Sequence, residues 1–289
     1  MPGNGRSERV SFLRAEIARI ERQGLRLPAR TLASSRASPS ASLPALLNGG
    51  LARGALHEIL AGSPGDLGAA AGFALALAIR FARARKEQHQ TRHAPVLWIT
   101  EDFACLENGA LYGPGLAQHG LDPADFVIVQ AANAKEALWG LEEAVKCRAP
   151  AAVVGEIWSL TKTYDLTASR RLLLAAQKGG TPCLLFAAGL SGAADQLSSS
   201  ADMRFEIRAG PSPQRASAGR LPLPGLAHWS VRLAKARASP TMIDRTLFRP
   251  VLWDHLEASF RDAHSLSLAP VSADGSHLAR APKHAQRSA

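Results

Sequence analysis

A loop of small residues between an apolar strand and an apolar helix is the first feature of this 289-residue chain that could do chemistry. The strand is predicted at 56–60, and the helix begins at about Leu67. The residues of this segment that could form the loop are Gly62, Ser63, Pro64, Gly65 and Gly68. A strand, a small-residue loop and a helix in this order are typical of phosphate-binding loops, in which backbone N–H groups and the helix N-terminus face the anion.

The residue types in this loop argue against phosphoryl transfer. The working motif G-x-x-x-x-G-K-[ST] supplies a Lys for the phosphates and a hydroxyl for magnesium. Here Gly62 and Gly68 are one residue too far apart, and Ala69 and Ala70 occupy the Lys and Ser/Thr places. Asp66 adds a negative charge beside any bound phosphate. Because little remains to neutralise charge in the transition state, we expect no ATP hydrolysis and no cofactor, with nucleotide binding without turnover as the alternative.

The histidines do not predict a metal site. His57 and Glu58 begin an H-E-x-x-H pattern, but its fifth residue is Ala61, so the second ligand is missing. His89 and His93 lie four residues apart in a polar segment, which we interpret as a chance surface pair.

Apolar runs that alternate with helical patterns place the loop in an α/β fold. Continuous apolar strands are predicted at 56–60, 95–100, 126–130, 151–154 and 182–186, and helices at 67–83, 134–147 and 166–178. Such strands indicate a mainly parallel sheet with helices on both faces. The segments 203–208 and 228–234 alternate apolar and polar residues, which predicts half-exposed antiparallel strands at the sheet edge.

The N-terminal segment is predicted to be a separate amphipathic helix within residues 1–24. Its narrow apolar stripe has spacings of three, four and three residues and consists of Val10, Leu13, Ile17 and Ile20. Residues 25–47, with Pro28 and Pro39, read as a linker before the core. The stripe must therefore pack either on its own domain or on a partner or neighbouring subunit.

The excess positive charge lies outside the middle of the chain. The formal net charge is +10; residues 1–40 contribute +5, residues 204–289 contribute +7, and residues 41–203 carry −2. We divide the chain after the linker into a core at 48–237, a basic C-terminal extension at 238–263 and a disordered basic tail at 264–289.

Basic residues in the C-terminal part are interleaved with aromatic ones, a pattern that can track phosphates and stack bases. The candidate nucleic-acid contacts are Arg232, Lys235, Arg237, Arg245 and Arg249. A solvated edge strand with core aromatics explains the same pattern, and an acidic protein surface would satisfy the same charges.

Location is predicted to be cytoplasmic. The three cysteines are far apart and form no C-x-x-C motif, which indicates a reducing compartment. The longest apolar stretch, 67–79, is shorter than the roughly 20 residues that span a bilayer, and no signal-peptide pattern is found.

The lead-in G-G-L-x-x-G-x-x-x-E-I from Gly49 to Ile59 resembles the entry to the ATPase core of RecA recombinases. The strand and helix order is similar to RecA through about Arg237. Over roughly four-fifths of its length the chain is more closely similar to the ImuA family, RecA-like accessory proteins of bacterial damage-inducible (SOS) mutagenesis that are sometimes labelled SulA-like.

The RecA resemblance assigns places to the residues of the eroded site. Glu101 is the nearest match to the glutamate that activates water in RecA-like ATPases. Gly155 replaces the aspartate expected at the end of a core strand, and Glu156 follows one position late, on the other face if the strand continues. The loop at 189–200 falls where RecA proteins carry a DNA-contacting loop, but it lacks Arg and aromatic residues.

The ImuA resemblance implies a non-catalytic scaffold for error-prone translesion synthesis. It implies as partners an inactive Y-family polymerase homologue and an error-prone replicative-type polymerase, while the RecA-like N-terminal helix implies contact with RecA itself or self-association. DNA would be bound directly or through these partners. The alternatives are a divergent DNA-dependent ATPase or recombination mediator, and a SulA-like inhibitor of cell division.

Overall fold

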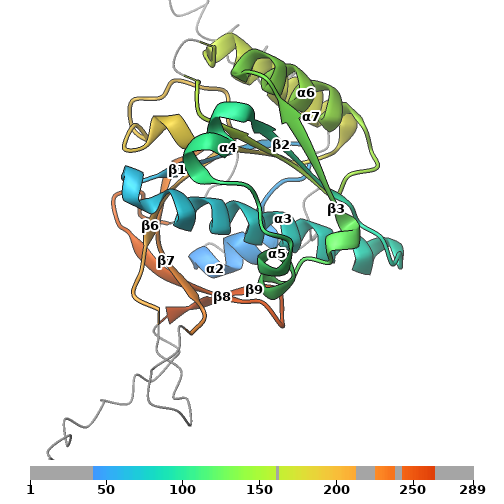
Figure 1. The fold of residues 1–289 in the computed structure, drawn as a ribbon. Helices are drawn as coiled ribbons and strands as arrows, with labels where there is room; N and C mark the ends of the chain where they lie inside the picture. The colour runs from blue at the N-terminus through green and yellow to red at the C-terminus, as the bar shows by residue number, and fades with distance from the viewer. Residues whose placement is uncertain (1–41, 161–162, 213–224, 238–242, 264–289) are drawn as a thin grey trace, which may run out of the picture.

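A computed structural model describes residues 42–160, 163–212, 225–237 and 243–263 (Figure 1). Its centre is a mixed sheet in the strand order β3-β2-β4-β5-β1-β6-β7-β8-β9. The strands are β1 Leu56–Ala61, β2 Val96–Glu101, β3 Phe126–Ala131, β4 Ala152–Ile157, β5 Cys183–Ala187, β6 Met203–Ala209, β7 Ala227–Ala236, β8 Arg249–Asp254 and β9 Ser259–Asp262. From β3 to β6 neighbouring strands are parallel, and from β6 to β9 they are antiparallel. The predicted α/β class, with a mainly parallel sheet and antiparallel strands at one edge, is confirmed.

Helices cover both faces of this sheet. They are α2 Leu43–Ala45, α3 Leu67–His89, α4 Asp102–Asn108, α5 Gly113–His119, α6 Ala134–Lys146 and α7 Leu166–Gly179. One core cluster joins α2, α3 and α5 to the sheet, and a second joins α6 and α7 to the opposite face. Figure 1 shows α6 and α7 above the sheet and α3 below it.

Helix α3 is apolar on nearly all sides because it lies inside the protein. Phe73, Leu77 and Ile79 are buried, and the helix contacts β1, β4, β5 and β6. By length and composition alone, the 26 residues 64–89 could cross a membrane. In this fold, however, 61% of the most apolar 18-residue stretch within them is buried inside the protein. Burial against a sheet accounts for this hydrophobicity.

The folded core extends past both predicted boundaries. Leu43, Leu46 and Leu47, placed in the linker from sequence, are buried against the core, and Asn48 exchanges two 2.8 Å hydrogen bonds with the backbone of Phe260. At the other end, β8 and β9 continue the sheet through the segment predicted as a basic extension. The N-terminal helix and the tail at 264–289 lie outside the described residues.

Strand β6 differs from its prediction as an antiparallel edge strand. It lies inside the sheet, parallel to β1 on one side and antiparallel to β7 on the other. Its polar residues Arg204 and Glu206 are buried, at 4% and 5% exposure. The alternation in this strand therefore reflects buried ion pairs on one face rather than contact with water.

Close packing at the end of α7 provides a test of the fold. A Cβ atom at Gly179 would lie 1.9 Å from the carbonyl oxygen of Val145, whereas one at Gly68 would meet open space. We expect Gly179→Ala to lower the free energy of unfolding by about 2 kcal/mol through overpacking. The matched control Gly68→Ala should raise it by about 0.5 kcal/mol because it improves helix propensity. Urea unfolding measures both, and equal stability of the two variants would contradict the packing.

Candidate functional site

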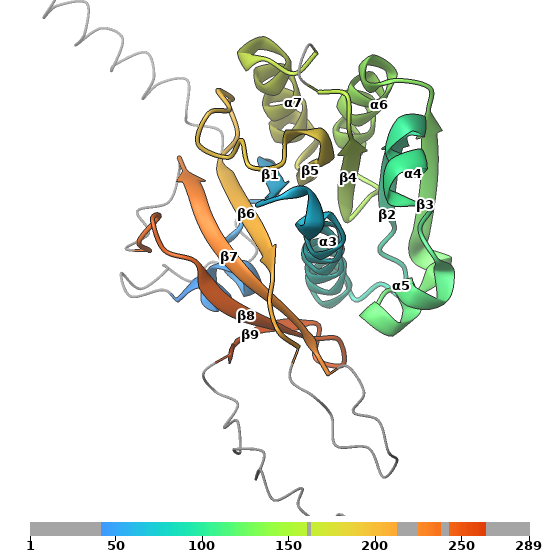
Figure 2. The same ribbon diagram turned by 60° about the vertical axis from the view of Figure 1, so that its left-hand side comes forward.

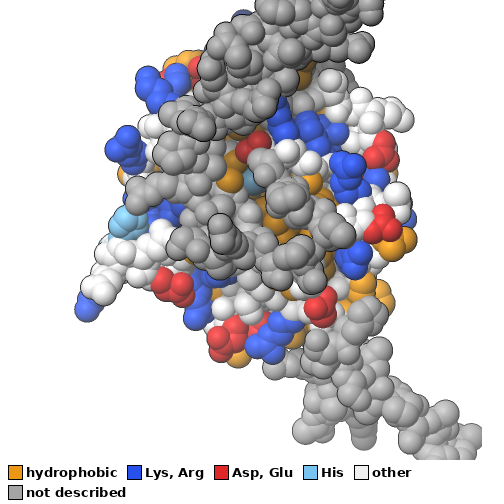
Figure 3. Space-filling view, turned by 180° about the vertical axis from the view of Figure 1, so that it is seen from behind, with side chains coloured by type: hydrophobic (Ala, Val, Ile, Leu, Met, Phe, Trp, Pro, Cys, Tyr) orange, Lys and Arg blue, Asp and Glu red, His pale blue; other side chains and the backbone are white. Residues whose placement is uncertain are grey.

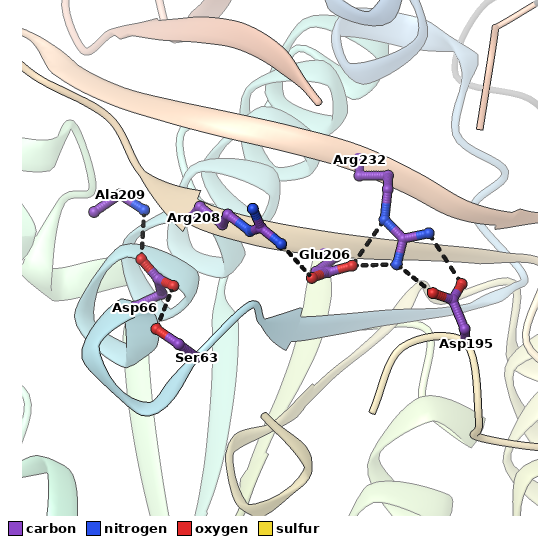
Figure 4. A network of polar contacts seen from close by, with 7 residues as sticks. All are labelled: Ser63, Asp66, Asp195, Glu206, Arg208, Ala209 and Arg232. Atoms are coloured by element: carbon purple, nitrogen blue, oxygen red, sulfur yellow. Dashed lines mark hydrogen bonds and ion pairs between the residues drawn. The ribbon is translucent and has the colours of Figure 1, made fainter. Parts of the chain in front are cut away.

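In the loop that resembles a phosphate-binding loop, the carboxylate of Asp66 bonds to Ser63 and to the end of β6 (Figure 4). Residues Pro64–Asp66 form a short 3-10 turn before α3. The Ser63 hydroxyl donates a 2.7 Å hydrogen bond to one oxygen of Asp66, and the backbone N–H of Ala209 donates a 2.8 Å bond to the other. The loop is thus tied to the end of β6, and the group that its polar atoms bind is negative.

The arginine nearest to this loop is held against protein groups. A Cβ atom at Gly62 would lie 2.7 Å from the Cγ of Arg208, so this side chain lies against the loop backbone. The Arg208 guanidinium lies 4.0 Å from the centre of the Phe248 ring and 3.6 Å from a carboxylate oxygen of Glu206. The cation–π contact and the ion pair together hold the guanidinium beside Phe248 and Glu206.

Glu101, the nearest match to the RecA-like glutamate, stabilises backbone instead of facing an open site. It is 3% exposed, and one carboxylate oxygen accepts 2.9 Å hydrogen bonds from the N–H groups of both Trp158 and Ser159. A carboxylate that accepts two backbone amides fixes the turn after β4.

Gly155 and Glu156 lie on opposite faces of β4. A Cβ atom at Gly155 would lie 2.3 Å from Leu141, so α6 packs where an aspartate side chain would have to go. Glu156 is 5% exposed and accepts hydrogen bonds of 3.0 Å from the Trp98 indole and 2.9 Å from the Asn108 amide. The side chains at the end of β4 are therefore used for packing and internal hydrogen bonds.

A buried ion pair at the centre of the sheet was not predicted. Glu58 and Arg204 are direct cross-strand neighbours on β1 and β6, and their side chains meet at 2.6 Å with 0% and 4% exposure. Tyr164 donates a 2.5 Å hydrogen bond to the other oxygen of Glu58. Burial, followed by the negative charge of Glu58, raises the pKa of Tyr164 well above its usual value, so the phenol stays a donor.

The same arginine holds the loop that follows β5. Its two remaining nitrogens donate hydrogen bonds of 2.7 Å to the Ala194 carbonyl and 2.8 Å to the Ser199 hydroxyl. The loop is also fixed from β1, since the N–H of Gly192 donates a 2.9 Å bond to the carbonyl of Ala61. The loop placed at the RecA-like DNA-contacting position is therefore tied down at several points.

The candidate nucleic-acid contacts on β7 point into this network. Arg232 is 14% exposed at its side chain and forms ion pairs with Asp195, at 2.8 Å, and with Glu206, its cross-strand neighbour (Figure 4). These acids raise the pKa of Arg232 further above its usual range, with the hydrogen bond to Asp195 as the main cause. Lys235 donates a 2.5 Å hydrogen bond to the Ser199 carbonyl.

The other three candidates are less enclosed. Arg237 is exposed and donates a 3.4 Å hydrogen bond to the Ser200 carbonyl; Arg245 is exposed, and Arg249 is half-buried. On the face shown in Figure 3, Lys and Arg side chains are interspersed with acidic ones. Of the five candidates, Arg232 and Lys235 are thus held by protein groups, whereas Arg237 and Arg245 are exposed. The predicted interaction stripe of Val10, Leu13, Ile17 and Ile20 lies outside the described residues.

His57 is fully buried and neutral. One ring nitrogen lies 2.9 Å from the Ala52 carbonyl, and the other has no partner. Burial lowers the pKa of His57 to about 4, against a smaller raising effect of the hydrogen bond to Ala52. His93 pairs with Asp125 at 3.0 Å. Within the ranges that the structure describes, no three His, Cys, Asp or Glu side chains gather as metal ligands would.

One sequence signal could have revealed the buried network. Glu58 stands among apolar residues in β1, and Arg204 and Glu206 alternate with apolar residues in β6. A charge inside an apolar strand needs an opposite charge beside it, because burial of an isolated charge is costly. The pairing required the strand order, which places β6 beside β1 across 140 residues of chain.

Replacing Arg232 distinguishes a structural role from nucleic-acid contact. Arg232→Ala leaves Glu206 buried with only the 3.6 Å contact to Arg208, so we expect the free energy of unfolding to fall by about 3 kcal/mol. The matched control Arg245→Ala, at an exposed position, should change it by less than about 0.5 kcal/mol. Urea denaturation measures both. An unaltered unfolding midpoint for Arg232→Ala would contradict the structural role.

The buried imidazole predicts a specific acid sensitivity. Between pH 6.5 and about 4 the unfolded chain binds a proton on His57 that the folded protein does not, so the stability contributed by this group is lost as the pH falls. The difference amounts to about 3 kcal/mol. His57→Gln removes the titrating group, so its free energy of unfolding, measured by urea denaturation, should fall less than that of the wild type over this range. Parallel pH profiles would contradict the buried neutral state.

No protein-family profile matches the sequence. The chain is 30% identical to Protein ImuA of Caulobacter vibrioides, in strains NA1000/CB15N and ATCC 19089/CB 15, over 219 residues that cover 74% of this chain and 82% of the relative. At this identity and coverage, the chain belongs to the ImuA family.

Proposed function

We propose that this protein is a non-catalytic scaffold in error-prone translesion synthesis, which binds an inactive Y-family polymerase homologue, an error-prone replicative-type polymerase and RecA. Family membership makes it an accessory protein of SOS mutagenesis. The proposal adds the absence of turnover, the partners, a cytoplasmic location, and contact with DNA directly or through the partners.

The observation that carries the absence of turnover is the position of Asp66. Its carboxylate accepts hydrogen bonds from Ser63 of the loop and from Ala209 at the end of β6, so a negative charge is fixed beside the loop. Ala69 and Ala70 supply neither a cation nor a magnesium ligand. A triphosphate placed here would meet the negative charge of Asp66, and the one arginine found beside the loop in the described residues, Arg208, is already paired with Glu206, whereas catalysis of phosphoryl transfer consists mainly of charge neutralisation.

The glutamates near the carboxyl ends of β2 and β4 add a second argument. One oxygen of Glu101 accepts two backbone amides, and the two oxygens of Glu156 accept bonds from an indole and an amide. A general base must be able to reach a water and take its proton. Both carboxylates instead accept hydrogen bonds from protein groups, which favours a scaffold over a divergent ATPase.

Partner binding is supported by the distribution of charge. The segments 1–40 and 204–289 carry the excess positive charge of the chain, although within the second segment Arg204 and Arg232 are paired with Glu58, Asp195 and Glu206. The charge available to an acidic partner or to DNA is therefore concentrated in the two flanks. Together with the apolar stripe at Val10–Ile20, these flanks are the proposed contact surfaces.

Complementation with a glutamate variant tests the scaffold role. Glu101→Gln keeps an oxygen that can accept the amides of Trp158 and Ser159 but cannot act as a base. In a strain lacking the gene, it should restore damage-induced mutation to within about twofold of wild type, whereas loss of a general base costs about a hundredfold or more in turnover. Mutation frequency after irradiation is the measurement, at matched protein levels.

The outcome that would contradict non-catalysis is loss of mutagenesis with Glu101→Gln, together with Mg-ATP turnover by the wild type on single-stranded DNA. For the partners, wild-type protein and Leu13→Asp/Ile17→Asp are used in pull-downs from damaged cells. Capture of a polymerase component or RecA by the wild type supports the proposal. Capture of none of them contradicts it, and capture that survives the double variant excludes the stripe as the contact.

A further inference from the structure

Strand β3 is an apolar sheet edge that the described part of the chain leaves uncovered. It pairs with β2 on one side, and within the described residues no strand pairs with its other side. Val127, Ile128 and Val129 are 48%, 47% and 40% exposed. Because successive strand residues point to opposite faces, apolar side chains are open to solvent on both faces of this edge.

This edge lacks the features with which proteins usually protect exposed strands. Residues 126–131 contain no charge and no proline, and their register with β2 is regular over six residue pairs. The edge strand at the other side of the sheet, β9, is only four residues long and carries Arg261 and Asp262 on exposed positions. A long, regular, uncharged edge such as β3 is therefore a template for pairing with another strand.

The surroundings of β3 offer apolar contact on the face that carries Ile128. A pocket of about 60 Å³ lies there, lined by side chains of β2, β3 and β4 and by the end of α4 with the residues after it. Its lining is mixed: Ile128, Cys105 and Leu111 are apolar, whereas Thr100, Gln130 and Glu156 are polar. Leu106 on α4 and Tyr112 beyond it are 81% and 72% exposed. Figure 2 shows α4 beside β2 and β3, so one face of an added strand would lie near these groups.

The charges next to β3 are mainly negative, in contrast to the chain as a whole. Exposed carboxylates lie on the elements that precede, follow or flank the strand: Asp102, Glu107, Asp122 and Glu136. Two exposed cations, Arg92 and Lys135, lie on neighbouring segments. This balance disfavours nucleic acid and disfavours pairing of β3 with β3 of a second copy, because the acids would face each other. It favours a segment with Lys or Arg at its ends.

The chain's own outlying segments are poor candidates for this position. Both join the fold at the far edge, since α2 packs against β9 and residue 263 follows β9, about 38 Å from β3 across eight strand spacings. The stripe at Val10–Ile20 has helical spacing, whereas an added strand needs apolar residues at every second position. Residues 25–41 contain two prolines, and beyond residue 271 Leu278 is the one large apolar residue.

We propose that β3 is the docking edge for an extended segment of a protein partner, apolar at alternate positions and flanked by Lys or Arg. The main chain of the segment continues the sheet, its alternate side chains pack beside Ile128 and over the neighbouring pocket, and its basic ends lie near the carboxylates. The identity of the partner as a member of the mutagenesis complex rests on the proposed function, whereas the docking chemistry does not.

Synthetic peptides and the full chain test this edge. The probe is a labelled peptide with alternating Val and Thr at its centre and two Lys at each end, and binding is followed by fluorescence anisotropy. We expect saturable binding that weakens about tenfold or more when Glu replaces the terminal Lys. Methylation of alternate backbone nitrogens in the probe should abolish binding, because it removes the ladder hydrogen bonds and keeps the side chains. Equal binding of the Lys and Glu peptides, or of the methylated peptide, overturns the proposal.

Variants of the protein provide the matched comparison. Ile128→Lys should weaken probe binding at least about tenfold, because it replaces an apolar contact with the centre of the probe by a cation that also repels the positively charged probe, while Leu174→Lys, at a 53% exposed position on α7, should leave the affinity unchanged. Hydrogen exchange on the wild type keeps the test independent of folding of the variant. The amides of residues 127–130 on the open edge should exchange quickly in the free protein and slow down with saturating probe.

Two further outcomes would overturn the proposal in favour of another occupant. Slow exchange of all β3 amides in the free, dilute protein would mean that the chain covers its own edge. Concentration-dependent association that Ile128→Lys abolishes would mean that a second copy of the chain covers the edge.

In a complementation assay, Ile128→Lys should lower damage-induced mutation while Leu174→Lys does not. If the wild-type protein supports mutagenesis but does not bind the probe, only the docking edge is refuted. If it binds the probe but does not support mutagenesis, only the proposed function is refuted.

Discussion

The ion pair between Glu58 and Arg204 is the constraint on which the centre of this structure depends. Both groups are buried on adjacent strands, so each charge needs the other and needs its remaining hydrogen bonds satisfied. Tyr164 donates a hydrogen bond to the second oxygen of Glu58. In the loop at 189–200, the Ala194 carbonyl and the Ser199 hydroxyl accept the remaining hydrogen bonds of Arg204. The loop cannot leave the sheet without removing two hydrogen bonds from the buried guanidinium, and a hydrogen bond to a charged group contributes about 1.5–3 kcal/mol.

This constraint changes the meaning of the basic C-terminal strands. Arg232 continues the network from β7 through Asp195 and Glu206, and Arg208 links it to the loop in which Asp66 accepts hydrogen bonds. Side chains that could have met phosphate are bonded to the protein itself. Within the described residues, Arg208 and Arg232 are therefore held by protein groups, and the surfaces that we propose for partners are the basic flanks and the uncovered edge at β3.

Most of the fold was predictable, and the centre of the site was not. Apolar runs bounded by Gly and Pro marked the strands because β2, β4 and β5 are buried on both faces, and α3 was recognisable as a core helix for the same reason. The alternation in β6 was interpreted as exposure because period-2 polarity is the same whether water or an ion-pair network lies on the polar face. Leu43, Leu46 and Leu47 are buried near β9, which lies more than 200 residues away in the chain, and local pattern does not reveal such a contact.

Hydrogen exchange in the loop at 189–200 tests most directly the claim that the core closes its own ancestral site. The amides of Gly192 and Ser200 donate to the Ala61 carbonyl and to the Ser169 hydroxyl, so they report on the loop that Arg204 holds. Slow exchange of both in the free protein, unchanged by Mg-ATP or single-stranded DNA, is the predicted result. Fast exchange in the free protein, with protection only when nucleotide or DNA is added, would contradict the account.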